Sequence, residues 1–202
     1  LCPVGALNNG LELMADETDP EMRQCCLELL GDSARTSANK LKFFRLAFGS
    51  AGGFGDAVPP HEARVAIEGM YSAVGRVKVG WMVEEQMLGK LAVKVLLNLA
   101  RNAMQAMDDP TITPRVLDIR VRRAASKGYS GWLEFSVADG GSGIPEEVAK
   151  KLFTPFFTTR TEGMGLGLSL CRTVVEQHGG YFGFAPNEPR GTVFTFTLPV
   201  KI

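Results

Sequence analysis

The sequence predicts an α+β protein, in which an N-terminal helical hairpin precedes a region of alternating helices and strands. Three observations support this prediction. Apolar residues recur at helical spacing in two stretches of the first 48 residues. Residues 49–61 are rich in Gly and Pro, which is typical of a linker. Beyond residue 61, runs of β-branched and aromatic residues alternate with helical patterns.

The predicted hairpin consists of two amphipathic helices. The first covers residues 4–14, and the second begins after the N-cap Asp19, with Pro20 in its first turn, and ends before Gly49. The apolar stripe of the second helix comprises Cys26, Leu29, Leu30, Ala34, Ala38, Leu41, Phe44 and Phe48. Because two helices alone bury little apolar surface, we expect residues 1–48 to form a dimeric four-helix bundle. Packing of the hairpin on the rest of its own chain is the alternative.

The second region, residues 62–202, is predicted to form a separate domain. Its expected elements are, in order, a strand at 76–83, a helix at 91–107, strands at 116–122 and 133–138, a helix at 166–177, and a β-hairpin at 180–184 and 191–198.

The composition excludes several classes of protein. Lys and Arg number 22 and Asp and Glu also number 22, so no excess of basic charge favours nucleic acid or an anionic membrane surface. The apolar runs are shorter than the roughly 20 residues that span a bilayer, and no signal-peptide pattern is present. We therefore expect a cytoplasmic protein without a membrane span. The cysteines lack metal-ligand spacing, which predicts buried free thiols at Cys2, Cys25, Cys26 and Cys171.

Two asparagines lie four residues apart in the helix predicted at 91–107. This spacing places Asn98 and Asn102 on one face of the helix. Their amide oxygens are neutral ligands that suit Mg²⁺, which prefers oxygen donors. Asn pairs at this spacing are also common without a function. The pair is therefore informative only together with the motifs that follow it.

A glycine-rich segment follows the strand predicted at 133–138. The run Asp139-Gly140-Gly141-Ser142-Gly143-Ile144 places a carboxylate at the strand end, where it can accept a hydrogen bond from the amino group of adenine. The glycines allow the backbone to turn tightly beside a base. A glycine-rich turn without a function is the alternative.

Two further segments complete the pattern. Residues 152–160 read Leu-Phe-Thr-Pro-Phe-Phe-Thr-Thr-Arg, and residues 163–170 read Gly-Met-Gly-Leu-Gly-Leu-Ser-Leu. Glycines that open a helix expose unpaired main-chain N–H groups, which bind phosphate. Thr159 and Arg160 can add hydroxyl and guanidinium donors to the same anion. The order and spacing of the four motifs are specific, although each motif alone is ambiguous.

On these motifs, residues 91–202 resemble the catalytic, ATP-binding domain of bacterial sensor histidine kinases, within the superfamily that includes gyrase, Hsp90 and MutL. The N, G1, F and G2 boxes of that family match the four motifs, and Gly191-Thr192-Val193-Phe194 is similar to its last glycine box. The resemblance implies an α/β sandwich of the Bergerat type, which binds ATP and Mg²⁺ between the helix of the N box and a short lid. The lid corresponds here to residues 158–164.

The resemblance also implies roles for single residues. Asn102 and Asn98 would hold Mg²⁺ and phosphate, and Asp139 would bind adenine. The phosphates would bind at Gly163, Gly165 and Gly167. The other ATP-binding residues that it implies are Gly141, Gly143, Ile144, Phe156, Thr158, Thr159, Arg160, Leu166, Leu168 and Thr192. Gyrase and the chaperones carry Glu where Asn98 stands. Since an amide cannot accept a water proton as a carboxylate does, this site favours phosphoryl transfer over ATP hydrolysis.

The first half of the chain resembles another family. Pro3-Val4-Gly5-Ala6, Asn8-Asn9-Gly10-Leu11-Glu12-Leu13 and Phe44-Arg45-Leu46-Ala47-Phe48-Gly49 are similar to the hairpin of the ChpT-type histidine phosphotransferases, and the likeness continues to about Leu99. Those proteins are dimers that pass a phosphoryl group between response regulators, and their kinase-like domain lacks the ATP boxes. Because the boxes are present here, we interpret the sequence as a mosaic, either a natural kinase with this hairpin or a fusion joined near Leu99.

Both families need a phosphoaccepting histidine on the first helix, and the resemblance implies that it lies immediately before Leu1. The chain has two histidines. His61 and Glu62 resemble an acceptor pair but lie outside any strong helical stripe, which favours a solvated loop residue. His178 is expected at a helix C-terminus, where it complements the dipole. We therefore expect nucleotide binding without self-phosphorylation. Cys2 stands where phosphatase-competent kinases carry Asn or Thr, which predicts weak phosphatase activity.

Three functions remain open at this stage. The intact ATP boxes favour the core of an ATP-dependent histidine kinase, which transfers the γ-phosphoryl group of ATP to the histidine and on to a response-regulator aspartate. The hairpin is also consistent with a phosphotransfer and docking module without catalysis. Another nucleotide-driven clamp is disfavoured by Asn98. The expected partners are a second copy of the chain and the receiver domain of a response regulator, with no nucleic acid.

Overall fold

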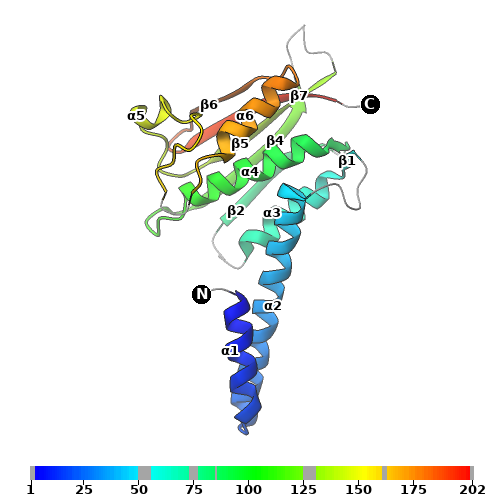
Figure 1. Cartoon of the computed structure of the whole chain (residues 1–202), viewed down its shortest axis with the longest axis vertical. Helices are drawn as coiled ribbons and strands as arrows, with labels where there is room; N and C mark the ends of the chain where they lie inside the picture. Colours follow the sequence, from blue (N-terminus) through cyan, green and yellow to red (C-terminus); the bar gives the residue numbers. More distant parts are fainter. Residues whose placement is uncertain are drawn as a thin grey trace.

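The computed structural model describes residues 3–49, 56–72, 77–84, 86–124, 131–160 and 163–200. Two antiparallel helices, α1 (Pro3–Asp16) and α2 (Pro20–Phe48), form a stalk that projects from a layered domain of one mixed sheet and its covering helices (Figure 1). The α+β fold and the N-terminal helical hairpin are therefore confirmed.

The start of α2 follows the predicted capping pattern. The carboxylate of Asp19 accepts a hydrogen bond from the N–H of Glu21 at 3.0 Å, and Pro20 occupies the first helical position. Where α1 crosses α2, Gly10 packs against Leu30, because a Cβ at Gly10 would lie 2.8 Å from Leu30 Cδ2. The absence of a side chain at this position lets the two helices approach closely.

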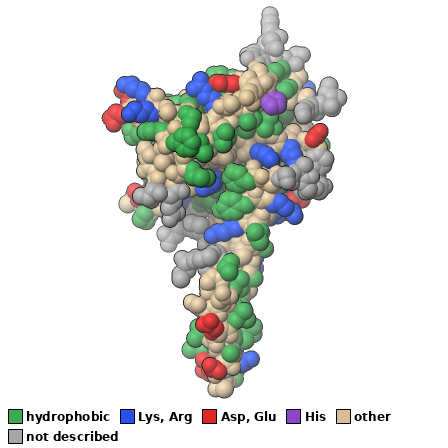
Figure 2. Space-filling view, viewed as in Figure 1, with side chains coloured by type: hydrophobic (Ala, Val, Ile, Leu, Met, Phe, Trp, Pro, Cys, Tyr) green, Lys and Arg blue, Asp and Glu red, His purple; other side chains and the backbone are tan. Residues whose placement is uncertain are grey.

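The predicted apolar stripe of α2 is open to solvent over much of its length. Leu29, Leu41 and Phe48 are at least half exposed, and Figure 2 shows hydrophobic side chains along the stalk surface. The face that packs on the rest of the chain is a different one, formed by Phe43 and Ala47, which are buried in the core. The helix α2 thus has an open apolar face for a dimeric four-helix bundle and a separate face that packs on the rest of its own chain.

The main sheet has five strands in the order β2-β4-β5-β7-β6. The strands are β2 (Val77–Val83), β4 (Arg115–Arg123), β5 (Trp132–Asp139), β6 (Phe182–Pro186) and β7 (Thr192–Pro199). The β2–β4 pair is parallel, and the other neighbours are antiparallel. Each strand overlaps the range that its sequence pattern predicts, and β6 and β7 form the predicted hairpin.

Two helices, α4 (Lys90–Ala106) and α6 (Gly167–Gln177), cover one face of this sheet (Figure 1). The rings of Phe135 on β5 and Phe196 on β7 are opposite each other in the ladder and stack with centroids 4.5 Å apart. Asp139 points to the same face as Phe135 because side chains alternate along a strand. The alternation therefore directs the carboxylate of Asp139 inward, towards α4.

Some elements were not predicted from the sequence. The helix α3 (Pro60–Ser72) buries Ala63, Ala66 and Ile67 against α2 and α4. A short pair of strands, β1 (Ala57–Val58) and β3 (Leu88–Gly89), and the single-turn helix α5 (Glu146–Ala149) are also present. The loop assignment of His61 was wrong, because His61 lies in the first turn of α3. Its Nε2 is 3.5 Å from Glu62 Oε1.

The cysteine prediction is confirmed in part. Cys25, Cys26 and Cys171 are free thiols, and Cys26 and Cys171 are buried. Cys25 is exposed, which corrects the prediction, and Cys2 lies outside the described residues. Within the described ranges, no helix combines the length and apolar character needed to cross a membrane.

Candidate functional site

The carboxylate of Asp139 is buried beside the C-terminal half of α4, with 2% of the residue exposed. The main-chain N–H groups of Gly141 and Thr192 donate to its Oδ1 at 2.9 and 3.3 Å. Burial raises the pKa of Asp139, and these two hydrogen bonds together with Arg160 oppose the shift only partly. Among the described residues, no hydrogen bond reaches Oδ2. This oxygen is therefore available to a donor on a ligand.

The glycine turn after Asp139 lies against the end of α4. A Cβ at Gly141 would lie 2.7 Å from the main-chain oxygen of Ala106. Gly143 has a φ of 76°, which favours glycine, and Ile144 packs against the core. The turn that follows Asp139, the predicted adenine ligand, thus packs against α4, the helix that carries Asn98 and Asn102.

Arg160 connects the predicted lid with α4. Its Nη1 donates to Asn102 Oδ1 at 3.3 Å and also to Gln105 Oε1, while its Nη2 donates to the main-chain oxygen of Asn102 at 3.3 Å. Burial and the neighbouring Arg101 lower the pKa of Arg160, and Asp139 acts in the opposite direction. Two of the predicted motifs, 58 residues apart, therefore meet at Asn102.

The N-terminus of α6 lies beside Asn98. A Cβ at Gly167, the first residue of α6, would lie 2.9 Å from Asn98 Oδ1. The N–H groups of a first helical turn have no intrahelical acceptors and carry partial positive charge. Leu166 stands just before the helix, and Leu168 packs against the core. Asn98 is therefore next to a helix end suited to phosphate.

The segment before the lid is anchored through Phe153. Its ring lies 5.7 and 5.8 Å from the rings of Phe182 and Phe184. Phe156 is 75% exposed and has a φ of 65°, and its N–H donates to the oxygen of Gly165 at 3.0 Å. A Cβ at Gly165 would lie 2.5 Å from the carbonyl carbon of Phe156, so a glycine is needed there.

The threonines of the lid differ in their surroundings. The hydroxyl of Thr158 accepts a hydrogen bond from the N–H of Arg160 at 3.0 Å, and a Cβ at Gly163 would lie 2.6 Å from that hydroxyl. Thr158 therefore shapes the lid turn. Thr159 is exposed, and residues 161–162 of the predicted lid lie outside the described residues.

These residues fit a nucleotide with a bound cation. Asn102 Nδ2 is buried and has no hydrogen-bond partner among the described residues, so it is an unused donor at the point where the motifs meet. The described ranges contain no group of three or more His, Cys, Asp or Glu that could hold a metal. A cation here would be held by amide oxygens, phosphate and water, which is a donor set that Mg²⁺ accepts.

Sequence reasoning missed two residues of this site. Gln105 accepts from Arg160, and its position one helical turn after Asn102 is a signal that could have identified it. Asn187, in the turn between β6 and β7, donates to the main-chain oxygen of Asp139 at 2.8 Å. No local pattern indicates this second contact, because the two residues are 48 positions apart.

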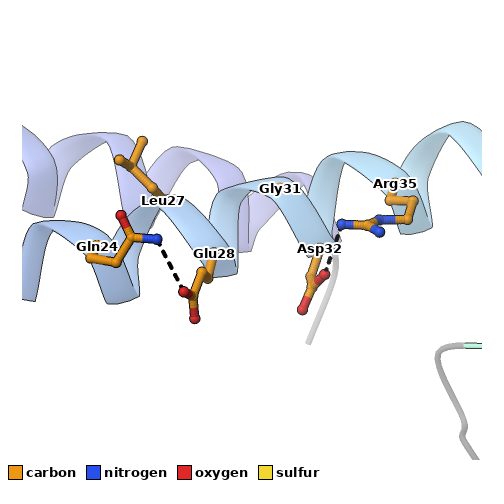
Figure 3. A pocket seen from close by; sticks show the side chains of 6 residues that line it. All are labelled: Gln24, Leu27, Glu28, Gly31, Asp32 and Arg35. Carbon is orange, nitrogen blue, oxygen red and sulfur yellow. Dashed lines mark hydrogen bonds and ion pairs between the residues drawn. The ribbon is translucent and has the colours of Figure 1, made fainter.

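A shallow pocket on α2 is unrelated to this site. All of its lining residues lie on α2, where Gln24 donates to Glu28 and Arg35 forms an ion pair with Asp32 (Figure 3). Paired polar groups on one helical face do not enclose a small molecule. The pocket therefore belongs to the surface of the stalk.

Comparisons with known proteins show the family to which the C-terminal domain belongs. The family described as "Histidine kinase-, DNA gyrase B-, and HSP90-like ATPase" matches residues 89–202. The C4-dicarboxylate transport sensor protein DctS of Rhodobacter capsulatus is 41% identical over 130 residues, which are 62% of this chain and 19% of DctS. Sensor histidine kinase ZraS of Escherichia coli K12 is 41% identical over 109 residues, 54% of this chain and 22% of ZraS. The chain thus spans about one fifth of the length of these relatives.

Two solved structures share the fold. A bacterial phosphotransferase superposes with a TM-score of 0.70 at 20% identity, over 96% of this chain and 87% of that protein. The nucleotide-free catalytic domain of histidine kinase ThkA superposes with a TM-score of 0.56 at 28% identity, over 71% of this chain and 93% of that domain. The first supports the arrangement of hairpin and sandwich, and the second supports the sandwich. The chain belongs to the family of histidine kinase-, DNA gyrase B- and HSP90-like ATPases, and residues 89–202 are its ATP-binding domain.

Proposed function

We propose that the chain is the ATP-dependent kinase core of a cytoplasmic two-component signalling protein. Residues 62–202 act as the catalytic domain, and residues 1–48 act as a dimerisation and phosphotransfer hairpin, joined by residues 49–61. The observation that carries the proposal is that Arg160 binds Asn102 on α4 and lies near enough to the buried Asp139 for each to affect the pKa of the other. The 41% identity to two sensor proteins supports the same class of activity.

Each part of the site has a role in this proposal. Asp139 Oδ2 accepts a hydrogen bond from the amino group of adenine, and the glycine turn admits the base. Asn102 and Asn98 hold Mg²⁺ and phosphate, where the cation would neutralise charge on the transferred γ-phosphoryl group. The N–H groups at the start of α6 bind phosphate oxygens. Arg160 would exchange its contacts with Asn102 for contacts with phosphate, because a guanidinium binds phosphate strongly.

In this proposal, the phosphoryl group passes from ATP to a histidine and then to a response-regulator aspartate. The two histidines of this chain are poorly placed for this role. The Nδ1 of His178 lies 2.9 Å from the main-chain oxygen of Val174 at the end of α6, and His61 lies in α3 beside Glu62. Covalent phosphate on either residue after incubation with ATP would contradict this assignment.

The first test concerns Asn102. We expect isothermal titration calorimetry to detect ATP binding by the wild type, with an affinity that Mg²⁺ increases. Asn102→Ala removes one oxygen donor and the unused Nδ2, so the gain from Mg²⁺ should fall by at least about tenfold. Gln105→Ala is the matched control, since Gln105 shares Arg160 with Asn102 but has no proposed contact with the cation. Gln105→Ala should keep the increase in ATP affinity that Mg²⁺ causes in the wild type.

The outcomes of this test separate the candidate functions. If the wild type does not bind ATP, the proposed kinase function is excluded and a phosphotransfer and docking module is favoured. Binding with equal losses in Asn102→Ala and Gln105→Ala would contradict the cation role of Asn102 while leaving the nucleotide site intact.

The second test concerns the dimer. The open stripe of the stalk is the surface that a second copy would cover in a four-helix bundle. Leu41 is 71% exposed, so Leu41→Glu should leave the single chain folded and convert a dimer into a monomer in light scattering. Leu170→Glu, at a 57% exposed position on α6, should leave the dimer unchanged. A monomeric wild type would contradict this proposal.

A further inference from the structure

Asn187 ties the turn between β6 and β7 to the end of β5. Its main-chain N–H donates to the oxygen of Gly191 at 3.0 Å, which closes the turn. Its side-chain Nδ2 donates to the main-chain oxygen of Asp139 at 2.8 Å. One residue therefore fixes both its own turn and the backbone of the residue that carries the buried carboxylate.

The side chain of Asn187 supplies a hydrogen bond to β5 just beyond the last residue pair of the β5–β7 ladder. The β5–β7 register ends at the pair Ala138 and Val193, one residue before Asp139. On its other side, the backbone is held by β4, because the N–H of Gly140 donates to the oxygen of Val116 at 3.2 Å. Without Asn187, a buried carbonyl would lose its side-chain donor, and an unpaired buried carbonyl costs free energy that favours rotation of its peptide towards another donor.

A rotation of this peptide would move the carboxylate. Its Oδ1 accepts hydrogen bonds from the N–H groups of Gly141 and Thr192, while Asn187 donates to the main-chain oxygen of the same residue. The direction of Oδ2 follows from these constraints together, since one end of the carboxylate is fixed and the backbone cannot turn.

We propose that Asn187 is a positioning residue for recognition of the nucleotide base. It holds the peptide of Asp139 so that the free carboxylate oxygen faces the amino group of adenine. This inference rests on the proposed function, in which Asp139 accepts that hydrogen bond. Asn187 itself needs no contact with the nucleotide.

The test compares ATP with purine riboside triphosphate, which has the same ring system and phosphates but no 6-amino group. Asn187→Leu has similar size and no donor. We expect it to weaken ATP binding by about three- to tenfold, the effect of one hydrogen bond, and to change binding of the purine analogue by less than about twofold. A general loosening of the turn would weaken both nucleotides equally, which would overturn the proposal.

Arg190→Ala is the matched control for the turn. Arg190 Nη2 donates to the oxygen of Thr113 at 3.2 Å, so the substitution removes an anchor of the same turn without touching Asp139. It should leave the ratio of the two affinities unchanged. In an Asp139→Asn background, Asn187→Leu should cause no further loss of ATP affinity, because the acceptor that it positions is gone.

A second variant keeps the proposal testable if Asn187→Leu does not fold. Asn187→Asp has nearly the same shape and places an oxygen against the oxygen of Asp139, so it should lower the ratio in the same direction. If the wild type binds ATP but both variants keep the wild-type ratio of affinities for ATP and the purine analogue, this inference is overturned and the proposed function is not. Failure of the wild type to bind ATP would overturn the proposed function and this inference with it.

Discussion

Asp139→Asn is expected to lower the affinity for ATP by about 10- to 100-fold, which corresponds to the loss of a hydrogen bond to a charged group. The amide oxygen can still accept from Gly141 and Thr192, so the turn keeps its shape. The amide nitrogen then replaces Oδ2 and directs a donor at the amino group of adenine, which is also a donor. Calorimetry with ATP measures the loss directly.

The same substitution should not destabilise the nucleotide-free protein. Burial raises the pKa of Asp139, so the folded state holds its proton more tightly than the unfolded state. The stability that this proton contributes is fully present below the pKa of the unfolded state and is lost as pH rises through the raised pKa. Ionisation of the buried carboxyl therefore costs stability, and the amide of Asn, which is neutral, avoids this cost. We expect thermal unfolding of Asp139→Asn at pH 7 to occur at or above the wild-type temperature.

A matched control and a pH series make this result specific. Asp118→Asn changes an aspartate of the neighbouring strand β4, whose carboxylate lies beside Gly80, and should leave the ATP affinity unchanged. ATP affinity of the wild type should fall as the pH decreases through the raised pKa of Asp139, because the protonated group is a weaker acceptor. Tight ATP binding by Asp139→Asn would contradict the proposed contact with the base.

The elements with strong periodicity were predictable from the sequence. The helix α4 and the strands β4 and β5 bury regular faces, and the capping pattern of Asp19 fixed the start of α2. The helix α3 was not predicted because two of the residues on its buried face, Ala63 and Ala66 beside Ile67, are small, and because it begins in a Pro-rich segment. Small residues bury little area each, so their pattern is weak.

The site was predictable to the extent that its residues act through local backbone geometry. Gly141 and Gly167 have their signal in the sequence because close approach of the chain requires glycine. The contacts of Arg160 with Asn102 and of Asn187 with Asp139 connect residues that are 58 and 48 positions apart. Pairings of this kind follow from the topology of the sheet, which one sequence does not specify residue by residue.

Gly191→Ala is expected to have the largest effect on folding. Gly191 has a φ of 105°, and a Cβ there would lie 1.9 Å from the main-chain oxygen of Asp139. The obstacle is backbone, fixed by Asn187 and by the β5–β7 ladder, so relief requires one of these to break. We expect the free energy of unfolding to fall by at least about 3 kcal/mol and the melting temperature by about 6–12 °C.

A substitution at a second glycine separates the two causes of this loss, which are the backbone strain at positive φ and the clash of the added Cβ. Gly131 has a φ of 85°, but a Cβ there would meet no atom within 4 Å, so Gly131→Ala carries the backbone strain without the clash. It should cost about 1–2 kcal/mol. The excess loss in Gly191→Ala then measures how rigidly the chain holds Asp139, and it should be accompanied by loss of ATP binding, because the N–H of Thr192 follows Gly191 directly. If both variants lose the same free energy of unfolding, the backbone at the end of β5 moves easily to relieve the clash. That result would contradict a preorganised acceptor for the base.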